Sequence, residues 1–176
     1  PEYWEDGTIP WLTSGEVRQT IIITVDNKIS ESGLANSSAK WLVSGTTVVA
    51  MYGATAGQVA YIDKPLTTNQ AVCGLTPKKG YQFFNYVTLS RAVAHFEGRA
   101  TGSAQQNINK GMIESTRVVV PSSISSDYFE EYCEVIFSKW IKNLHENETL
   151  TKLRDTLLPK LMSGELRIAD AAAMVN

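Results

Sequence analysis

The chain has 176 residues, of which 43% are hydrophobic, enough for one compact domain with an appendage. It contains no run of about 18 apolar residues, so we expect no membrane span, and the polar start at Pro1 does not resemble a signal peptide. These features predict a cytoplasmic protein. Cys73 and Cys133 are too few for a disulfide framework, and His95 and His145 have no neighbours at metal-ligand spacing, so no metal site is expected.

Charge is uneven along the chain, although its net value is only -2. A near-neutral total argues against a sequence-independent nucleic-acid binder, because such proteins are strongly basic. Residues 64–117 nevertheless carry seven Lys or Arg and two Asp or Glu, a local net charge of +5. We expect any phosphate contact in this segment, and a solvated surface with uneven charge is the alternative.

The first half of the chain predicts short strands separated by turns. Residues 46–52 and 58–62 are rich in β-branched and aromatic side chains, and Gly53 and Gly57 between them permit a tight reversal. These features predict a hairpin. Residues 70–76 predict a further strand that stops at a proline. Strands and turns at such close spacing indicate a small, curved and mostly antiparallel sheet.

From residue 81 onward, apolar side chains recur every three or four positions. Residues 81–97 therefore predict an amphipathic helix against the sheet, with Gly98 as its stop. The polar residues 101–111 have no period and predict a loop, and residues 117–120 predict another strand before a proline. The predicted fold class is α+β, with a small curved sheet, one packed helix and one long coiled-coil-type helix.

A long apolar stripe follows, on a helix of about 30 residues capped by Ser126 or Asp127. Pro159 either ends this helix or restarts it as a short turn, and Gly164 supplies a stop. A free helix of this length cannot bury its own stripe, so we expect a partner helix in cis or from a second copy. The alternative is that the stripe faces its own domain. The stripe residues expected at the partner-helix interface are Phe129, Cys133, Ile136, Trp140, Leu144, Leu150, Leu153, Leu157 and Leu161.

Familiar catalytic motifs are missing from the sequence, including a glycine-rich cofactor loop, a P-loop and a His-Glu-x-x-His zinc motif. We therefore expect no catalytic residues and no cofactor bound by this chain. The sequence does contain side chains that can recognise DNA. Arg and Lys bind guanine edges, Asn and Gln bind adenine edges, and Ser or Thr bind either phosphate or base. For the amides of the polar loop, structural hydrogen bonding is the favoured alternative, and the four tryptophans are expected in the core or an interface. The candidate DNA-binding residues are Ser14, Tyr52, Thr55, Thr68, Asn69, Arg99, Ser103, Gln105, Gln106, Asn109 and Lys110.

Several segments together resemble the specificity subunit of type I restriction-modification enzymes. They occur in the family's order and span nearly the whole chain. The matching segments are residues 9–17, 36–39, the hairpin at 50–60, and residues 67–71, 102–108 and 153–166.

The resemblance implies a DNA target-recognition domain at residues 1–122, a conserved spacer helix with its terminating turn at 123–168, and a flexible tail at 169–176. In that family, two such domains each recognise one half of a split double-stranded DNA sequence, and two antiparallel spacer helices hold them apart. The subunit itself is non-catalytic. It positions methyltransferase subunits, which use S-adenosylmethionine to methylate adenine, and restriction subunits, which use ATP and Mg²⁺ to translocate and cut DNA.

The chain departs from the family pattern in two respects. The usual opening strand is missing before Pro1, and a single recognition domain is followed by a single spacer helix. We therefore expect either a piece of a longer subunit or a half-subunit that pairs with itself. A second hypothesis, from another class, is a dimerisation scaffold whose head binds a protein instead of DNA. A third, a small methyltransferase, lacks a cofactor motif in the sequence.

Overall fold

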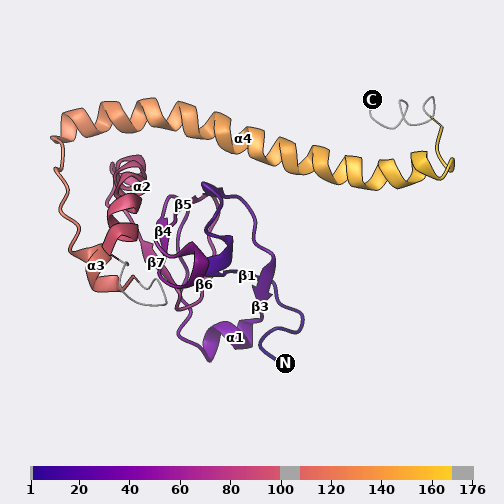
Figure 1. The fold of residues 1–176 in the computed structure, drawn as a ribbon, viewed down its shortest axis with the longest axis horizontal. Helices are drawn as coiled ribbons and strands as arrows, with labels where there is room; N and C mark the ends of the chain where they lie inside the picture. The colour runs from indigo at the N-terminus through magenta and orange to yellow at the C-terminus, as the bar shows by residue number, and fades with distance from the viewer. Residues whose placement is uncertain (1, 100–107, 168–176) are drawn as a thin grey trace. The chain divides into compact units, whose positions relative to one another are not determined.

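The protein is represented by a computed structural model that describes residues 2–99 and 108–167, with the backbone alone at residues 93–99. Its residues form two compact units, Pro1–Ile136, which we call the head, and Phe137–Asn176, which we call the helical unit. Helix α4 (Ser123–Met162) is continuous across this boundary, so its first turns belong to the head (Figure 1). The predicted α+β class is confirmed, with a packed helix and one long helix.

The strands of the head form two small mixed sheets. The three-stranded sheet has the order β3-β1-β6, and the four-stranded sheet has the order β2-β5-β4-β7. The pairs β1–β3, β4–β5 and β4–β7 are antiparallel, whereas β1–β6 and β2–β5 are parallel. The strand bounds are Ile9–Leu12 (β1), Ile21–Ile22 (β2), Asn27–Ile29 (β3), Thr47–Ala50 (β4), Val59–Ile62 (β5), Thr67–Thr68 (β6) and Val72–Leu75 (β7).

The predicted hairpin is present at β4 and β5. The two strands pair with Val49 opposite Val59, and the short 3-10 helix η2 (Gly53–Thr55) connects them. Gly53 and Gly57 have φ values of 80° and 90°, a left-handed conformation that favours glycine over residues with a Cβ. The two glycines therefore supply the reversal, as the sequence indicates.

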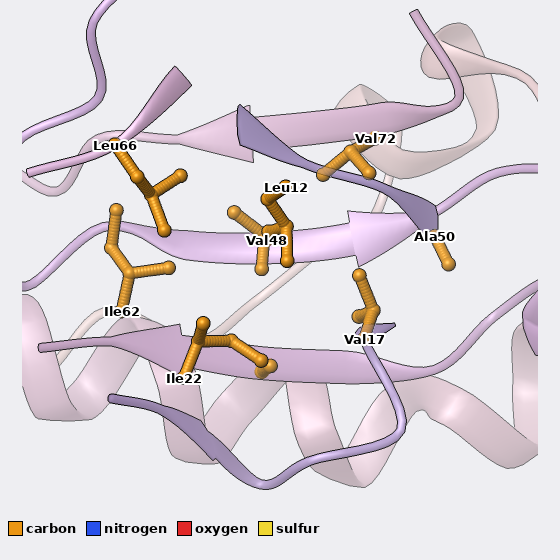
Figure 2. Close-up of a cluster of buried hydrophobic side chains, with 9 residues drawn as sticks. Leu12, Val17, Ile22, Val48, Ala50, Ile62, Leu66 and Val72 are labelled. Atoms are coloured by element: carbon orange, nitrogen blue, oxygen red, sulfur yellow. The ribbon is translucent and has the colours of Figure 1, made fainter. Parts of the chain in front are cut away.

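Both central strands are buried along their whole length, so each face of the four-stranded sheet is covered. Side chains alternate between the faces with a period of two. One set joins a cluster of buried aliphatic side chains, which includes Leu12 of β1 and Val48 of β4 (Figure 2). The cluster comprises Leu12, Val17, Ile22, Val48, Ala50, Ala60, Ile62, Leu66 and Val72.

Helix α2 (Gln82–Arg99) covers the other face of the four-stranded sheet. Tyr61 of β5 stacks on Phe83, with ring centroids 5.7 Å apart, and meets Tyr86 edge to face at 6.0 Å. Burial, followed by the negative charges of Glu134, Asp63 and Glu130, raises the pKa of Tyr61 to about 12. The helix runs through Gly98 to Arg99, so the predicted stop lies inside it by one residue.

One prediction for the connections is wrong, and another is wrong only at its last two residues. Residues 117–120 form no strand, because no neighbouring strand pairs with this β-branched run, and Val119 is 92% exposed. The predicted loop at residues 101–111 ends in the short helix α3 (Lys110–Glu114), while residues 100–107 lie outside the described part of the chain. β propensity by itself does not make a strand when no partner edge is available.

Helix α4 is longer than predicted at both ends. It begins at Ser123, and the Ser122 hydroxyl accepts a hydrogen bond from the Ser125 N–H at 3.3 Å, so the cap lies four residues before Ser126. Pro159 neither ends nor restarts the helix, which continues to Met162. The carbonyl that loses its N–H partner to this proline lies on an exposed turn, where water can replace the bond. Gly164 then follows with φ 75°.

The tryptophans are less buried than predicted. Trp11 is half-buried and packs edge to face on Trp4 with ring centroids 4.7 Å apart, yet Trp4 remains 49% exposed. Trp41 is 48% exposed. An indole is large and is rarely enclosed completely, and the buried cluster of the head consists of aliphatic side chains. The remaining short elements are η1 (Ser14–Glu16) and α1 (Glu31–Ala35).

Candidate nucleic-acid interface

An open groove with a volume of about 310 Å³ lies on the head beside strand β7. Its floor is apolar and its rim carries amides, hydroxyls and two lysines. Among the described residues that line it, none is acidic. We call the apolar lining residues Leu42, Met51, Val72, Cys73 and Gly74 the floor, and the polar lining residues Ser38, Lys40, Thr68, Asn69, Gln70 and Lys110 the rim.

The turn between β6 and β7 forms one side of the groove, and backbone hydrogen bonds hold it in place. The Asn69 N–H donates to the Leu12 carbonyl at 3.1 Å, and the Val72 N–H donates to the Asn69 carbonyl at 3.2 Å. The Asn69 side-chain oxygen accepts from the Ala71 N–H at 3.1 Å, a local turn typical of asparagine. Gln70 occupies the exposed tip of this turn.

Helix α3 brings Lys110 to the groove. Ile108 is fully buried, and its N–H donates to the Met51 carbonyl at 2.9 Å, which anchors the start of this segment. Asn109 then caps the helix, because its side-chain oxygen accepts from the Met112 N–H at 2.9 Å. Asn109 was predicted to contact DNA, with structural hydrogen bonding as the alternative role. Its side chain makes such a structural hydrogen bond.

The two lysines give the rim a positive potential. Lys110 lies 3.3 Å from Glu114, but both side chains are largely exposed, so solvent screens this pair and leaves it weak. Burial raises the pKa of the Cys73 thiol in the floor, while the Lys110 charge opposes this shift and Glu114 adds to it. The raised pKa shows that the apolar floor itself disfavours a negative charge, so we expect an anionic phosphate at the exposed lysines of the rim instead.

The groove brings three of the predicted site residues together, namely Thr68, Asn69 and Lys110. Thr68 is half-buried beside the apolar floor, and Asn69 uses its side-chain oxygen within the turn. The sequence prediction missed Ser38, Lys40 and Gln70 as groove residues. Ser38 and Gln70 lie within segments 36–39 and 67–71, which carry the family resemblance, and Lys40 directly follows the first of these segments. By themselves, isolated lysines and a lone glutamine form no motif.

Thr55 and Ser14 lie together elsewhere on the head. Thr55 is only 3% exposed, and its hydroxyl donates to the Ser14 carbonyl at 2.8 Å. Thr55, a candidate DNA contact, is therefore buried, because η2 packs against η1 and covers this end of the turn. Tyr52, the residue before η2, is 42% exposed and remains available. Four candidates lie where no side chain is described, namely Arg99 at the last position of α2, and Ser103, Gln105 and Gln106.

The start of α4 is tied to α2 within the head. The Glu130 carboxylate accepts hydrogen bonds from the Phe83 and Phe84 N–H groups at 3.1 and 2.8 Å, which satisfies free amides in the first turn of α2. The Ser126 hydroxyl donates to the Gly80 carbonyl at 2.6 Å. No apolar periodicity signals such contacts, and the sequence prediction missed them.

These contacts correct the predicted partner-helix interface in its first turns. Phe129 lines a hollow of about 430 Å³ with Phe84 and Val87 of α2, and Cys133 is buried. Cys133 therefore faces its own domain, which is the alternative to a partner-helix contact, and Phe129 is half-buried against α2. A different face of the head's part of α4 is open. It consists of Ile124, Tyr128, Tyr132 and Val135, each between 69% and 72% exposed.

The rest of the stripe lies at or after the end of the head and is partly accessible. Ile136, Trp140, Leu150 and Leu153 are between 38% and 56% exposed. Leu144, Leu157 and Leu161 are half-buried. Exposed apolar side chains at helical spacing are typical of a surface that binds another helix.

The described residues show no group of three or more His, Cys, Asp or Glu side chains placed to hold a metal ion. Within the same residues, no helix combines the length and apolar character needed to cross a membrane.

Comparison with known proteins identifies the family. The family described as the type I restriction modification DNA specificity domain matches residues 2–154. The chain belongs to this family. The match covers most of the head and helix α4, including every residue that lines the groove.

Relatives of this specificity domain agree with the assignment. The chain is 28% identical over 170 residues to the HindI specificity subunit of Haemophilus influenzae, covering 94% of this chain and 37% of that protein. It is 23% identical over 127 residues to the EcoR124I/EcoR124II specificity subunit of Escherichia coli, covering 69% of this chain and 31% of that protein. The specificity domain thus spans about a third of the length of these relatives.

A solved structure shares the fold of this specificity domain. It comes from work entitled "Structural basis underlying complex assembly and conformational transition of the type I R-M system". The TM-score is 0.52 at 15% sequence identity, and the likeness covers 93% of this chain and 40% of that chain. At this identity the comparison concerns the fold alone.

Proposed function

We propose that this chain is a non-catalytic DNA-recognition module that binds one half of a bipartite double-stranded DNA target. The observation that carries the proposal is the groove, which Thr68, Asn69 and Gln70 line together with two lysines on a domain of the DNA specificity family. Lysines supply sequence-independent phosphate contacts, and hydroxyls and amides supply contacts to base edges. The described residues that line the groove include no acidic side chain, and the nearby Glu114 is paired with Lys110.

The proposal includes partner subunits. Methyltransferase subunits would supply S-adenosylmethionine chemistry, and restriction subunits would supply ATP- and Mg²⁺-dependent translocation and cleavage. The accessible apolar residues Trp140, Leu150 and Leu153 support the presence of a second spacer helix, in cis or from another copy. Because the net charge is -2, we expect weak DNA binding by the chain alone and tighter binding with the methyltransferase subunit.

The lysines provide the test of DNA binding. In the assembled complex with the methyltransferase subunit, replacing Lys40 and Lys110 by Gln should weaken binding to every duplex. If each lysine neutralises one phosphate, the slope of log affinity against log salt should become shallower by about 0.9 for each. Fluorescence anisotropy titrations at several salt concentrations measure this slope. Lys28→Gln, an exposed lysine on β3 outside the groove, is the matched control.

A scaffold whose head binds a protein is the second candidate. The open face of Ile124, Tyr128, Tyr132 and Val135 favours it, because exposed apolar residues flanked by acidic side chains suit a protein surface. An unchanged salt slope in the lysine double variant would support this candidate against DNA recognition. Equal DNA affinity with and without the methyltransferase subunit would instead contradict the proposed contribution of that subunit.

A further inference from the structure

The tip of the turn between β6 and β7 has a well-defined backbone. Asn69 is bonded to β1 through the Leu12 carbonyl at 3.1 Å, and the Ala71 carbonyl accepts from the Met51 N–H, next to β4, at 2.8 Å. The asparagine side chain closes the same turn from within. Gln70 therefore projects from a backbone that is fixed on both sides, which lowers the conformational entropy lost when its side chain binds a partner.

Gln70 differs from the other amides of the site. The side-chain oxygens of Asn69 and Asn109 are engaged with backbone N–H groups. The Gln70 side chain is exposed and has no hydrogen-bond partner among the described residues. Its acceptor oxygen and donor nitrogen are both available, and an adenine edge requires this pair, because adenine presents an N7 acceptor beside an N6 donor.

The surroundings of Gln70 suit a base contact. The nearby floor residues Leu42, Met51 and Val72 offer no polar side-chain atoms that would compete for the amide. Lys40 and Lys110 line the same groove from separate segments of the chain, so phosphate contacts can orient a duplex around the turn.

We propose that Gln70 is a specificity-determining residue that selects an adenine within the recognised half-site. This inference rests on the proposed DNA-recognition function. Removing one bidentate contact of this kind should reduce discrimination at that base pair by about 5- to 150-fold. The other positions of the target should keep their preference, because they depend on other side chains.

The test is a selection from a randomised DNA duplex pool with the full-length protein assembled with its methyltransferase subunit. We expect the wild type to return a sequence motif. Gln70→Ala should return the same motif without the preference for adenine at one position. Gln19→Ala, another exposed glutamine on the head outside the groove, should return the wild-type motif. A melting temperature for each variant shows whether it is folded.

A second variant tests the inference by a change of preference instead of a loss. Gln70→Arg should shift the same position from adenine toward guanine, because arginine pairs with the guanine O6 and N7 atoms. An unchanged motif for both Gln70 variants, or a change confined to other positions, would overturn the role of Gln70 and leave DNA recognition intact. A wild-type complex that returns no motif would overturn the proposed function itself, and the inference with it.

Discussion

The head and the helical unit use their apolar residues in different ways. The head encloses Leu12, Val48 and Ile62 completely between its sheets, whereas the helical unit leaves Leu150 and Leu158 about half exposed. A buried side chain contributes to the stability of its own domain as soon as the chain folds. A half-exposed one contributes its remaining apolar area only when a partner covers it. Stability should therefore be intrinsic to the head and dependent on assembly in the helical unit.

The largest expected effect is on the core of the head. Ile62→Ala should lower the free energy of unfolding by about 2–5 kcal/mol, because it leaves a cavity in a closed cluster. Urea denaturation of the full chain, followed by fluorescence, measures the change. Leu158→Ala in the helical unit should alter this free energy by no more than about 0.5 kcal/mol. An equal loss of unfolding free energy in both variants would contradict the proposed difference between the head and the helical unit.

The next effect concerns assembly. Replacing Leu150 and Leu153 by Asp should weaken association by about 2 kcal/mol, roughly 30-fold, because about half of each side chain is still available for burial. Light scattering of whatever assembly the wild type forms, at several concentrations, measures the loss. Thr151→Asp adds a charge at an exposed position between them and should leave the mass unchanged. An unaltered mass for the double variant would show that this face is not an interface.

A smaller effect concerns the contact that joins α4 to α2. Glu130→Ala removes the acceptor of two N–H groups and should destabilise the head by about 1–2 kcal/mol. Glu131→Ala, an exposed neighbour, is the control and should have little effect. Thermal unfolding of the two variants compares them directly. If they melt together, the Glu130 hydrogen bonds do not contribute to stability.

The smallest effect depends on pH. The folded pKa of Tyr61 is raised from 10.0 to about 12, so its contribution to stability is complete below pH 10 and is lost as the pH rises through 12. At pH 11 the loss should be about 1 kcal/mol. Tyr61→Phe should lack this part of the alkaline destabilisation, as urea midpoints at pH 8 and pH 11 would reveal. Tyr128→Phe, which removes an exposed hydroxyl, should follow the wild type; identical pH profiles for all three proteins would contradict the effect.

Elements that depend on neighbours in sequence were predictable. The hairpin of β4 and β5 follows from two β-branched runs and two glycines, and α2 follows from an apolar period of three to four. The failed strand at residues 117–120 shows the limit of such signals. Its valines have the required propensity, but a strand also needs an edge to pair with, and that edge is supplied by distant parts of the chain.

The candidate site was predictable only in part. Thr68, Asn69 and Lys110 could be selected because hydroxyls, amides and lysines are the groups that contact DNA. Their convergence on one groove with Lys40 and Gln70 depends on three segments that are distant in sequence. Thr55 was selected as a DNA contact from its place in a turn, but a turn residue is exposed only if no other segment packs over it, and Thr55 is bonded to Ser14.

By itself, the sequence determined the α+β class, the hairpin, the two longest helices and a long apolar stripe, because each follows from periodicity or glycine placement within a short window. The tertiary structure decided which amides are available and which are engaged. It assigned Cys133 to the interior, Phe129 to a half-buried position beside α2, and Ile124 and Tyr128 to the surface. The physical reason is that burial and hydrogen-bond partnership are properties of contacts between remote segments. A residue's chemistry defines what it can bind, and packing determines whether it is free to do so.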